Sequence, residues 1–165
     1  MSPLAIVRGT MLVATAAWAA GEALMKRSPL ADRWARAIWT IGIAFALIHV
    51  ALAFHLIYAW DHEAAVAATA RQTADRIGWG WRGGIYVNYA FLAVWLLDVC
   101  WWWIRPESHK SRSMRVERTR LAVFLFMFFN GAVVFASGTG RVVGIGSMIV
   151  VLLASVARQP RSSYA

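Results

Sequence analysis

The fold class is indicated most clearly by a stretch that is apolar apart from two histidines, Ile43-Ala44-Phe45-Ala46-Leu47-Ile48-His49-Val50-Ala51-Leu52-Ala53-Phe54-His55. Comparable apolar blocks recur along the chain, and about 20 such residues in a helix cross a bilayer core. The 165 residues are 60% hydrophobic, with a mean hydropathy of +0.55, whereas soluble domains are about 45–50% apolar. We therefore expect an all-α integral membrane helix bundle that forms a single transmembrane domain over residues 1–165.

The apolar blocks predict five transmembrane helices and one short outer-loop helix. The spans are expected at about residues 4–25, 37–59, 85–104, 120–138 and 142–157, and the loop helix at about 62–77. Asp61 is a suitable N-cap for the loop helix. Gly140 and Gly144 have the small-xxx-small spacing that allows close helix packing.

Basic residues predict the orientation of the spans. Twelve of the 17 Lys and Arg residues lie in segments 26–36 and 105–120 and in the C-terminal tail. Five spans place all twelve on one side, which the positive-inside rule assigns to the cytoplasm. We expect a bacterial-type inner (plasma) membrane protein with its N-terminus outside and its C-terminus cytoplasmic.

The segment Ala17-Trp18-Ala19 is similar to a signal-peptidase site. Cleavage there would place the basic segment 26–36 outside, against the positive-inside rule, so we expect the first helix to be retained.

Aromatic residues are expected at both membrane interfaces, where indole and phenol rings are favoured. The inner boundary would hold Trp34, Trp39 and Trp101-Trp102-Trp103, and the outer one Trp60, Trp79, Trp81 and Tyr86. The segment 105–118 is expected to be a short solvated loop.

Ionisable side chains within a span are candidate functional residues, because placing a charge in hydrocarbon has a high free-energy cost. His49 and His55 point about 120° apart on a straight helix and lie about 9 Å apart along it, so one metal ion cannot bind both, and we expect no metal site. Haem b is the cofactor that fits, with His49 or His55 as an axial ligand. His109, predicted in the inner loop, would be out of reach, so a second ligand would come from another subunit. The alternative is that both histidines are neutral and hydrogen-bonded to a neighbouring helix.

Asp98 is the second costly group, and Arg105, seven residues later, would share its helix face. Asp98, His49 and Asn130 are candidates for a proton relay. The alternative for Asp98 is a paired or hydrogen-bonded structural carboxyl group.

The net charge of +9 does not indicate nucleic-acid binding, because the basic residues are divided among short segments between apolar blocks. The chain shows no catalytic constellation. We expect a non-enzymatic multi-pass protein that is a small structural or accessory subunit of a larger membrane complex. Its partners would be the lipid bilayer and other membrane subunits or a second copy of the chain. The alternatives are a haem-binding protein using His49 or His55, and a proton or small-solute carrier using Asp98 and His49.

Five spans in about 160 residues, ten tryptophans and an N-out, C-in orientation resemble the tryptophan-rich sensory protein/translocator family, which binds porphyrins and related ligands. The Pro-Pro segment that precedes the second span in that family is absent here, as are its later Trp/Asn motifs. The resemblance therefore implies the architecture alone, and no site residues are carried over.

Overall fold

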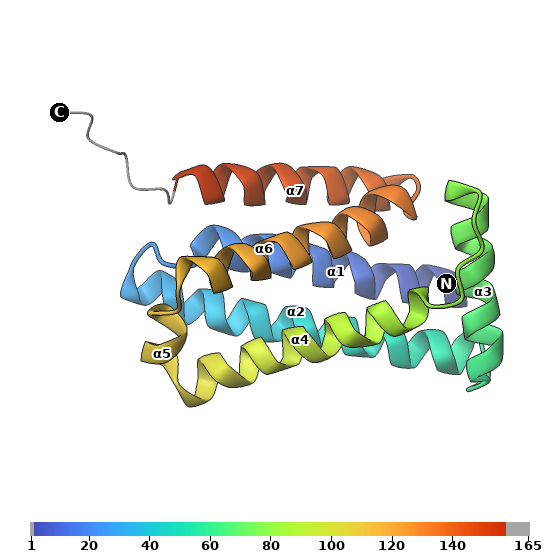
Figure 1. Ribbon diagram of the computed structural model, residues 1–165, viewed down its shortest axis with the longest axis horizontal. Helices are drawn as coiled ribbons and strands as arrows, with labels where there is room; N and C mark the ends of the chain where they lie inside the picture. Colours follow the sequence, from blue (N-terminus) through green and yellow to red (C-terminus); the bar gives the residue numbers. More distant parts are fainter. Residues whose placement is uncertain (1, 158–165) are drawn as a thin grey trace.

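The computed structural model describes residues 2–157, and all the regular structure in this range is helical. Figure 1 shows long helices running roughly parallel and antiparallel to one another, with one helix lying across an end of the bundle. This part of the chain has four helices that are long and apolar enough to cross a membrane, which are α1, α2, α4 and α7. The fold is therefore compatible with a multi-pass membrane helix bundle.

The first two helices form an antiparallel pair joined by a tight turn. Helix α1 is Pro3–Leu24, and helix α2 is Pro29–Leu56. Helix α2 begins eight residues before the span expected at 37–59, so segment 26–36 is mostly helix rather than loop. The reason is a local start signal, because the Ser28 hydroxyl accepts a hydrogen bond from the Ala31 amide and Pro29 occupies the first turn.

Helix α3 is His62–Ile77, which agrees with the range expected for the loop helix. The Asp61 carboxylate accepts a hydrogen bond from the amide of Ala64 at 3.1 Å, so Asp61 is the N-cap as expected. Gly78 ends the helix with a φ of 76°, a left-handed conformation that glycine adopts without strain. The helix lies across the bundle end where α2 finishes and α4 begins (Figure 1).

The second half of the chain differs from the expected spans. Helix α4 is Gly84–Ile104, and a short helix α5, Pro106–Lys110, follows it directly. Helix α6 is Met114–Phe129 and continues into a π-helical turn, η1, at Asn130–Val134. Helix α7 is Thr139–Ala157. Segment 105–118 is exposed over most of its length, as expected, but it is not a loop. It contains α5 and the first turn of α6, and His109 and Arg112 within it are buried.

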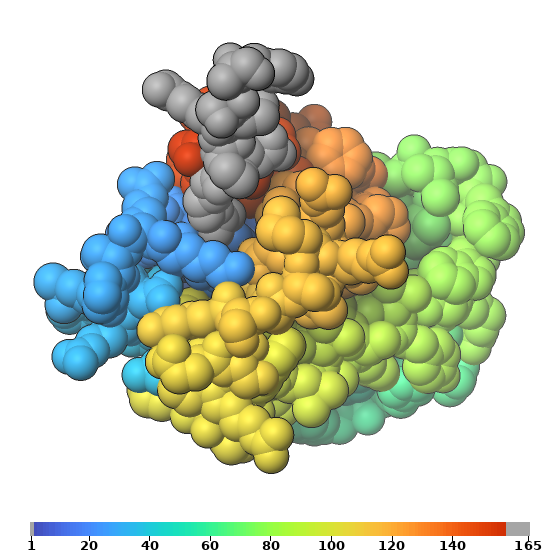
Figure 2. All heavy atoms as spheres, turned by 60° about the vertical axis from the view of Figure 1, so that its left-hand side comes forward, coloured from blue at the N-terminus to red at the C-terminus, as the bar shows by residue number. Residues whose placement is uncertain are grey.

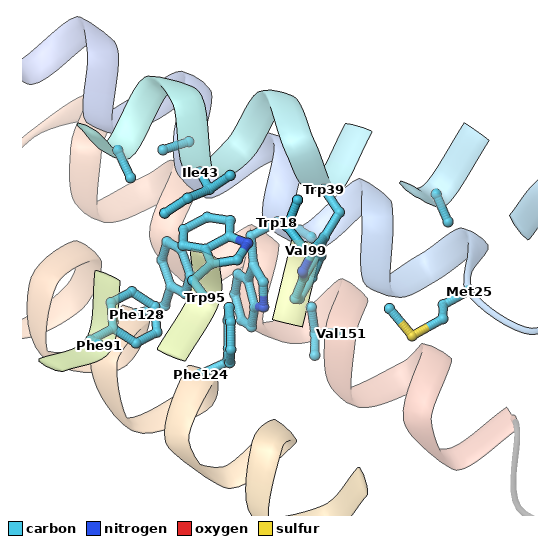
Figure 3. Close-up of a cluster of buried hydrophobic side chains, with 14 of the residues drawn as sticks. Trp18, Met25, Trp39, Ile43, Phe91, Trp95, Val99, Phe124, Phe128 and Val151 are labelled. Atoms are coloured by element: carbon cyan, nitrogen blue, oxygen red, sulfur yellow. The ribbon is translucent and has the colours of Figure 1, made fainter. Parts of the chain in front are cut away.

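An aromatic core fills the centre of the bundle (Figure 3). The Trp18 ring stacks on Phe128 with ring centroids 4.2 Å apart, and Trp39 meets Trp95 edge-on at 5.6 Å. Trp18, Trp39 and Trp95 are fully buried. The interfacial position expected for Trp39 is therefore wrong, because the early start of α2 places it in the third helical turn, facing inward. Trp102 is also buried, whereas Trp34 and Trp103 are exposed.

Close packing of α7 depends on Gly144. A Cβ atom added to Gly144 would overlap the carbonyl oxygen of Ala132 in η1, whereas one added to Gly146 would meet nothing within 4 Å. The close approach expected from the Gly140-xxx-Gly144 spacing is therefore present at its second glycine.

We predict that Gly144→Ala lowers the stability of the bundle by about 1–3 kcal/mol, because the added methyl group has to push two backbones apart. The measurement is thermal unfolding of the protein in mild detergent. Gly146→Ala adds the same methyl group to the same helix in open space, and we expect it to unfold as the wild type does. Equal melting temperatures for the two variants would contradict the packing.

Candidate functional site

Six ionisable side chains converge at the end of the bundle opposite α3, and we call them the ionic cluster. They are Glu22, Asp98, His109, Arg112, Glu117 and Arg120. They come from α1, α4, α5, the α5–α6 connection and α6, so four helices and a loop meet in one group. All are buried except Glu117, which is partly exposed.

Arg120 is the central cation of the ionic cluster. Its Nη1 donates to Oε1 of Glu22, which is fully buried, and its Nη2 donates to Oε1 of Glu117 at 3.0 Å. Its guanidinium carbon also lies 5.1 Å from the centre of the Trp39 ring, a cation–π distance. Arg120 therefore joins the first and sixth helices by charge and contacts the aromatic core beneath them.

Arg112 is the second cation, and it connects the same carboxylate to α4. Its Nε donates to Oε2 of Glu117, and its Nη1 donates to Oδ1 of Asp98 at 3.1 Å. Glu117 is therefore a carboxylate shared by two arginines, with Lys26 Nζ a further 3.5 Å away.

His109 adds a titratable ring to the cluster. Its Nε2 lies 2.6 Å from Nη1 of Arg112 and 3.3 Å from Oδ1 of Asp98, and its ring stacks on Trp102 at 4.4 Å. A guanidinium can only donate, so the shorter contact makes Nε2 an acceptor and leaves the proton on Nδ1. Burial lowers the pKa of His109, the Asp98 carboxylate opposes that shift, and the charge of Arg112 supports it.

The partner found for Asp98 differs from the one expected. Helix α4 ends at Ile104, and Arg105 leaves it with a φ of −136°, so its side chain no longer follows the face of Asp98. Arg112 and His109 take that place. His109 lies in α5 rather than in the expected loop, and its ring stacks on Trp102. No local pattern indicates this contact, because Pro106 restarts a helix only five residues long.

The histidines predicted as ligands lie toward the other end of the bundle. His49 Nδ1 is 2.9 Å from the carbonyl oxygen of Val7 and 3.4 Å from the Thr10 hydroxyl, as the hydrogen-bonded alternative expects. His55 is exposed, with its ring centre 6.4 Å from that of Trp60. The two rings therefore contact different surroundings, and haem ligation by either one stays a prediction.

The candidate proton relay is divided between the two ends of the bundle. Asp98 lies toward the end of α4 that leads into α5, whereas His49 and Asn130 lie near the ends of α2 and α6 on the side of α3 (Figure 1). The Asn130 amide donates to the Phe126 carbonyl of its own helix at 2.8 Å. Among residues 2–157 no hydrogen bond joins Asp98 to His49 or Asn130, and the relay stays a prediction.

We predict that Arg120→Met destabilises the protein by about 3–5 kcal/mol, because it removes the cation that the buried Glu22 carboxylate faces. Denaturant unfolding in mild detergent measures the loss. Glu22→Gln/Arg120→Met should cost less than the sum of the two single substitutions, since no buried carboxylate is then left facing a missing cation. Strictly additive losses would show that the pair is not coupled.

The lowered pKa of His109 predicts a pH dependence of stability with a definite sign. The folded state releases this proton more readily than the unfolded chain, whose histidines have a pKa of about 6.5. The contribution is therefore complete above that pH and is lost as the pH falls below it. Melting temperatures at pH 8 and pH 5 should differ less in His109→Gln than in the wild type. The exposed His55→Gln is the matched control, and an unchanged pH response in His109→Gln would contradict the assignment.

No family model, curated protein or solved structure matches this chain. The resemblance to the translocator family therefore stays an expectation drawn from the sequence.

Proposed function

We propose that this protein is a non-enzymatic, multi-pass membrane protein that acts as a structural or accessory subunit of a larger membrane complex. The proposal rests on one observation, which is that the buried charged side chains hydrogen-bond to one another. Glu22, Glu117 and Asp98 each accept from an arginine of the same cluster. These ion pairs hold the ends of the helices together, which is a structural role.

The proposed topology has five membrane-spanning segments, with α6 and η1 together forming the fourth. Met114–Phe129 and Asn130–Val134 are continuous in the chain, and α7 packs against both. The N-terminus of α1 would lie outside, at the α3 end, and the end of α7 would lie in the cytoplasm. The charge bias supports this orientation, since residues 57–83 hold three basic and three acidic residues, whereas residues 105–120 hold six basic and two acidic ones.

Helix α7 supplies the surface that supports a subunit role. It packs against α1, α6 and η1 on one side, and Val142, Leu153 and Val156 are about two-thirds or more exposed on the other. Without interhelical charges, an apolar face of this kind is suited to lipid or to a second membrane helix. The subunit proposal assigns at least part of this face to a neighbouring helix of the complex.

We predict that the protein, extracted from its native membrane in mild detergent, has a particle mass well above that of one 18.3 kDa chain, as measured by light scattering corrected for detergent. Leu153→Trp should release the single chain, because the larger side chain prevents close approach along α7. Leu97→Trp, at an equally exposed position of α4, is the matched control and should leave the assembly intact.

A lone monomer in the wild type would contradict the subunit proposal.

Membrane placement is tested separately, by retention of the full chain in the membrane pellet after alkaline carbonate extraction. Release into the supernatant would contradict the membrane proposal itself.

A further inference from the structure

A basic groove lies on the surface next to the ionic cluster, between the α1–α2 turn and α5. Two hollows of about 310 Å³ and 280 Å³ adjoin each other, because Pro29, Asp32 and Lys110 line both of them. Five basic residues line them, and we call the two hollows together the basic groove: Lys26, Arg27, Arg33, Arg36 and Lys110. Figure 2 shows the face on which the α1–α2 turn, in blue, lies beside α5, in yellow.

The groove keeps an excess of positive charge after its internal ion pairs are counted. Its only acidic lining residues are Asp32 and Glu107, and both lie within 3.7 Å of Lys110 Nζ. Arg27 and Arg33 are exposed, and neither forms an ion pair within the part of the chain that the structure describes. The groove therefore presents guanidinium groups suited to the oxygens of a phosphate.

Arg36 adds a third guanidinium group to the lining of the second hollow. It stacks on the Trp103 ring at 4.1 Å, and its Nε is buried without a hydrogen-bond partner. Stacking fixes the plane of the group, so fewer rotamers need to be frozen when an anion binds.

Exposed apolar side chains flank the same groove. Leu30 and Trp34 of α2 are more than 60% exposed, and Trp103 and Ile104 at the end of α4 are 52% and 75% exposed. Tryptophans concentrate at the level of lipid headgroups. Exposed cations and exposed apolar side chains are thus adjacent, and a phospholipid has the complementary combination of an anionic headgroup and apolar acyl chains.

We propose that the basic groove binds the headgroup phosphate of an anionic phospholipid, with the acyl chains lying along the exposed faces of α2 and α4. Arg33 and Arg36, from one hollow, and Arg27, from the adjoining hollow, supply the guanidinium groups that contact the phosphate. The neutral charge balance of residues 57–83 at the α3 end gives no comparable attraction there. The site rests on the membrane placement proposed above, which carbonate extraction tests without reference to lipid class.

The test is lipid binding to the full chain in mild detergent, followed by native mass spectrometry with phosphatidylglycerol and phosphatidylcholine of identical acyl chains. We expect preferential binding of phosphatidylglycerol. Arg27→Gln/Arg33→Gln should weaken it by roughly tenfold or more, since each surface cation contributes to attraction of anionic lipid, and should leave phosphatidylcholine binding unchanged. Both side chains are exposed, so melting temperature should not change.

The matched control is Arg71→Gln/Arg76→Gln, which removes the same charge from exposed positions of α3 and should leave phosphatidylglycerol binding intact. Equal losses in the two double variants would overturn the site, because attraction would then depend on net charge alone. Equal binding of the two lipids would also overturn it. Displacement of phosphatidylglycerol by inorganic phosphate at comparable concentration would show that the groove recognises a soluble phosphate and not a lipid.

Discussion

Arg120 donates to Glu22 across the end of the bundle, and the other charges there are arranged around this buried pair. Two charges removed from water are stable only when each remains hydrogen-bonded to the other or to further groups. Glu117 meets that requirement on α6 by accepting from both Arg120 and Arg112, and Arg112 extends the chain of contacts to Asp98 on α4. The ends of α1, α4 and α6 are therefore fixed relative to one another by electrostatics, while aromatic packing fixes their middles.

His109 makes this arrangement depend on protonation. A neutral ring accepts from Arg112 through Nε2, but a protonated ring would place a donor on the same nitrogen, 2.6 Å from a guanidinium. Its remaining partner would be Oδ1 of Asp98, 3.3 Å away. The neutral ring therefore favours the contact of Nε2 with Arg112, and the protonated ring favours its contact with Asp98. The stacked Trp102 ring holds the imidazole in place in both forms.

Hydrophobic pattern and cap residues predicted much of the fold, because these signals are local. They located α3 to the residue and placed α1, α4 and α7 within a few residues of their observed bounds. Ser28 and Pro29 also mark the early start of α2, but the charged residues that follow them are equally typical of a loop between spans. The ionic cluster was not predictable in this way. Its pairs join residues up to 98 positions apart, and the return of His109 toward Asp98 depends on how α5 packs, which no short sequence pattern encodes.

The ionic cluster also shows that not all of the basic residues that predict the orientation are exposed at the surface. Arg112 and Arg120 belong to the basic segment 105–120, yet both are buried and neutralised by carboxylates from the helices. They contribute to cohesion rather than to a surface field. The field comes from the cations left exposed, including Arg115 and Arg118 on α6 and the residues of the basic groove. The basic residues at this end of the bundle thus form two sets. One set is buried and paired with carboxylates, and the other is exposed and available to anions.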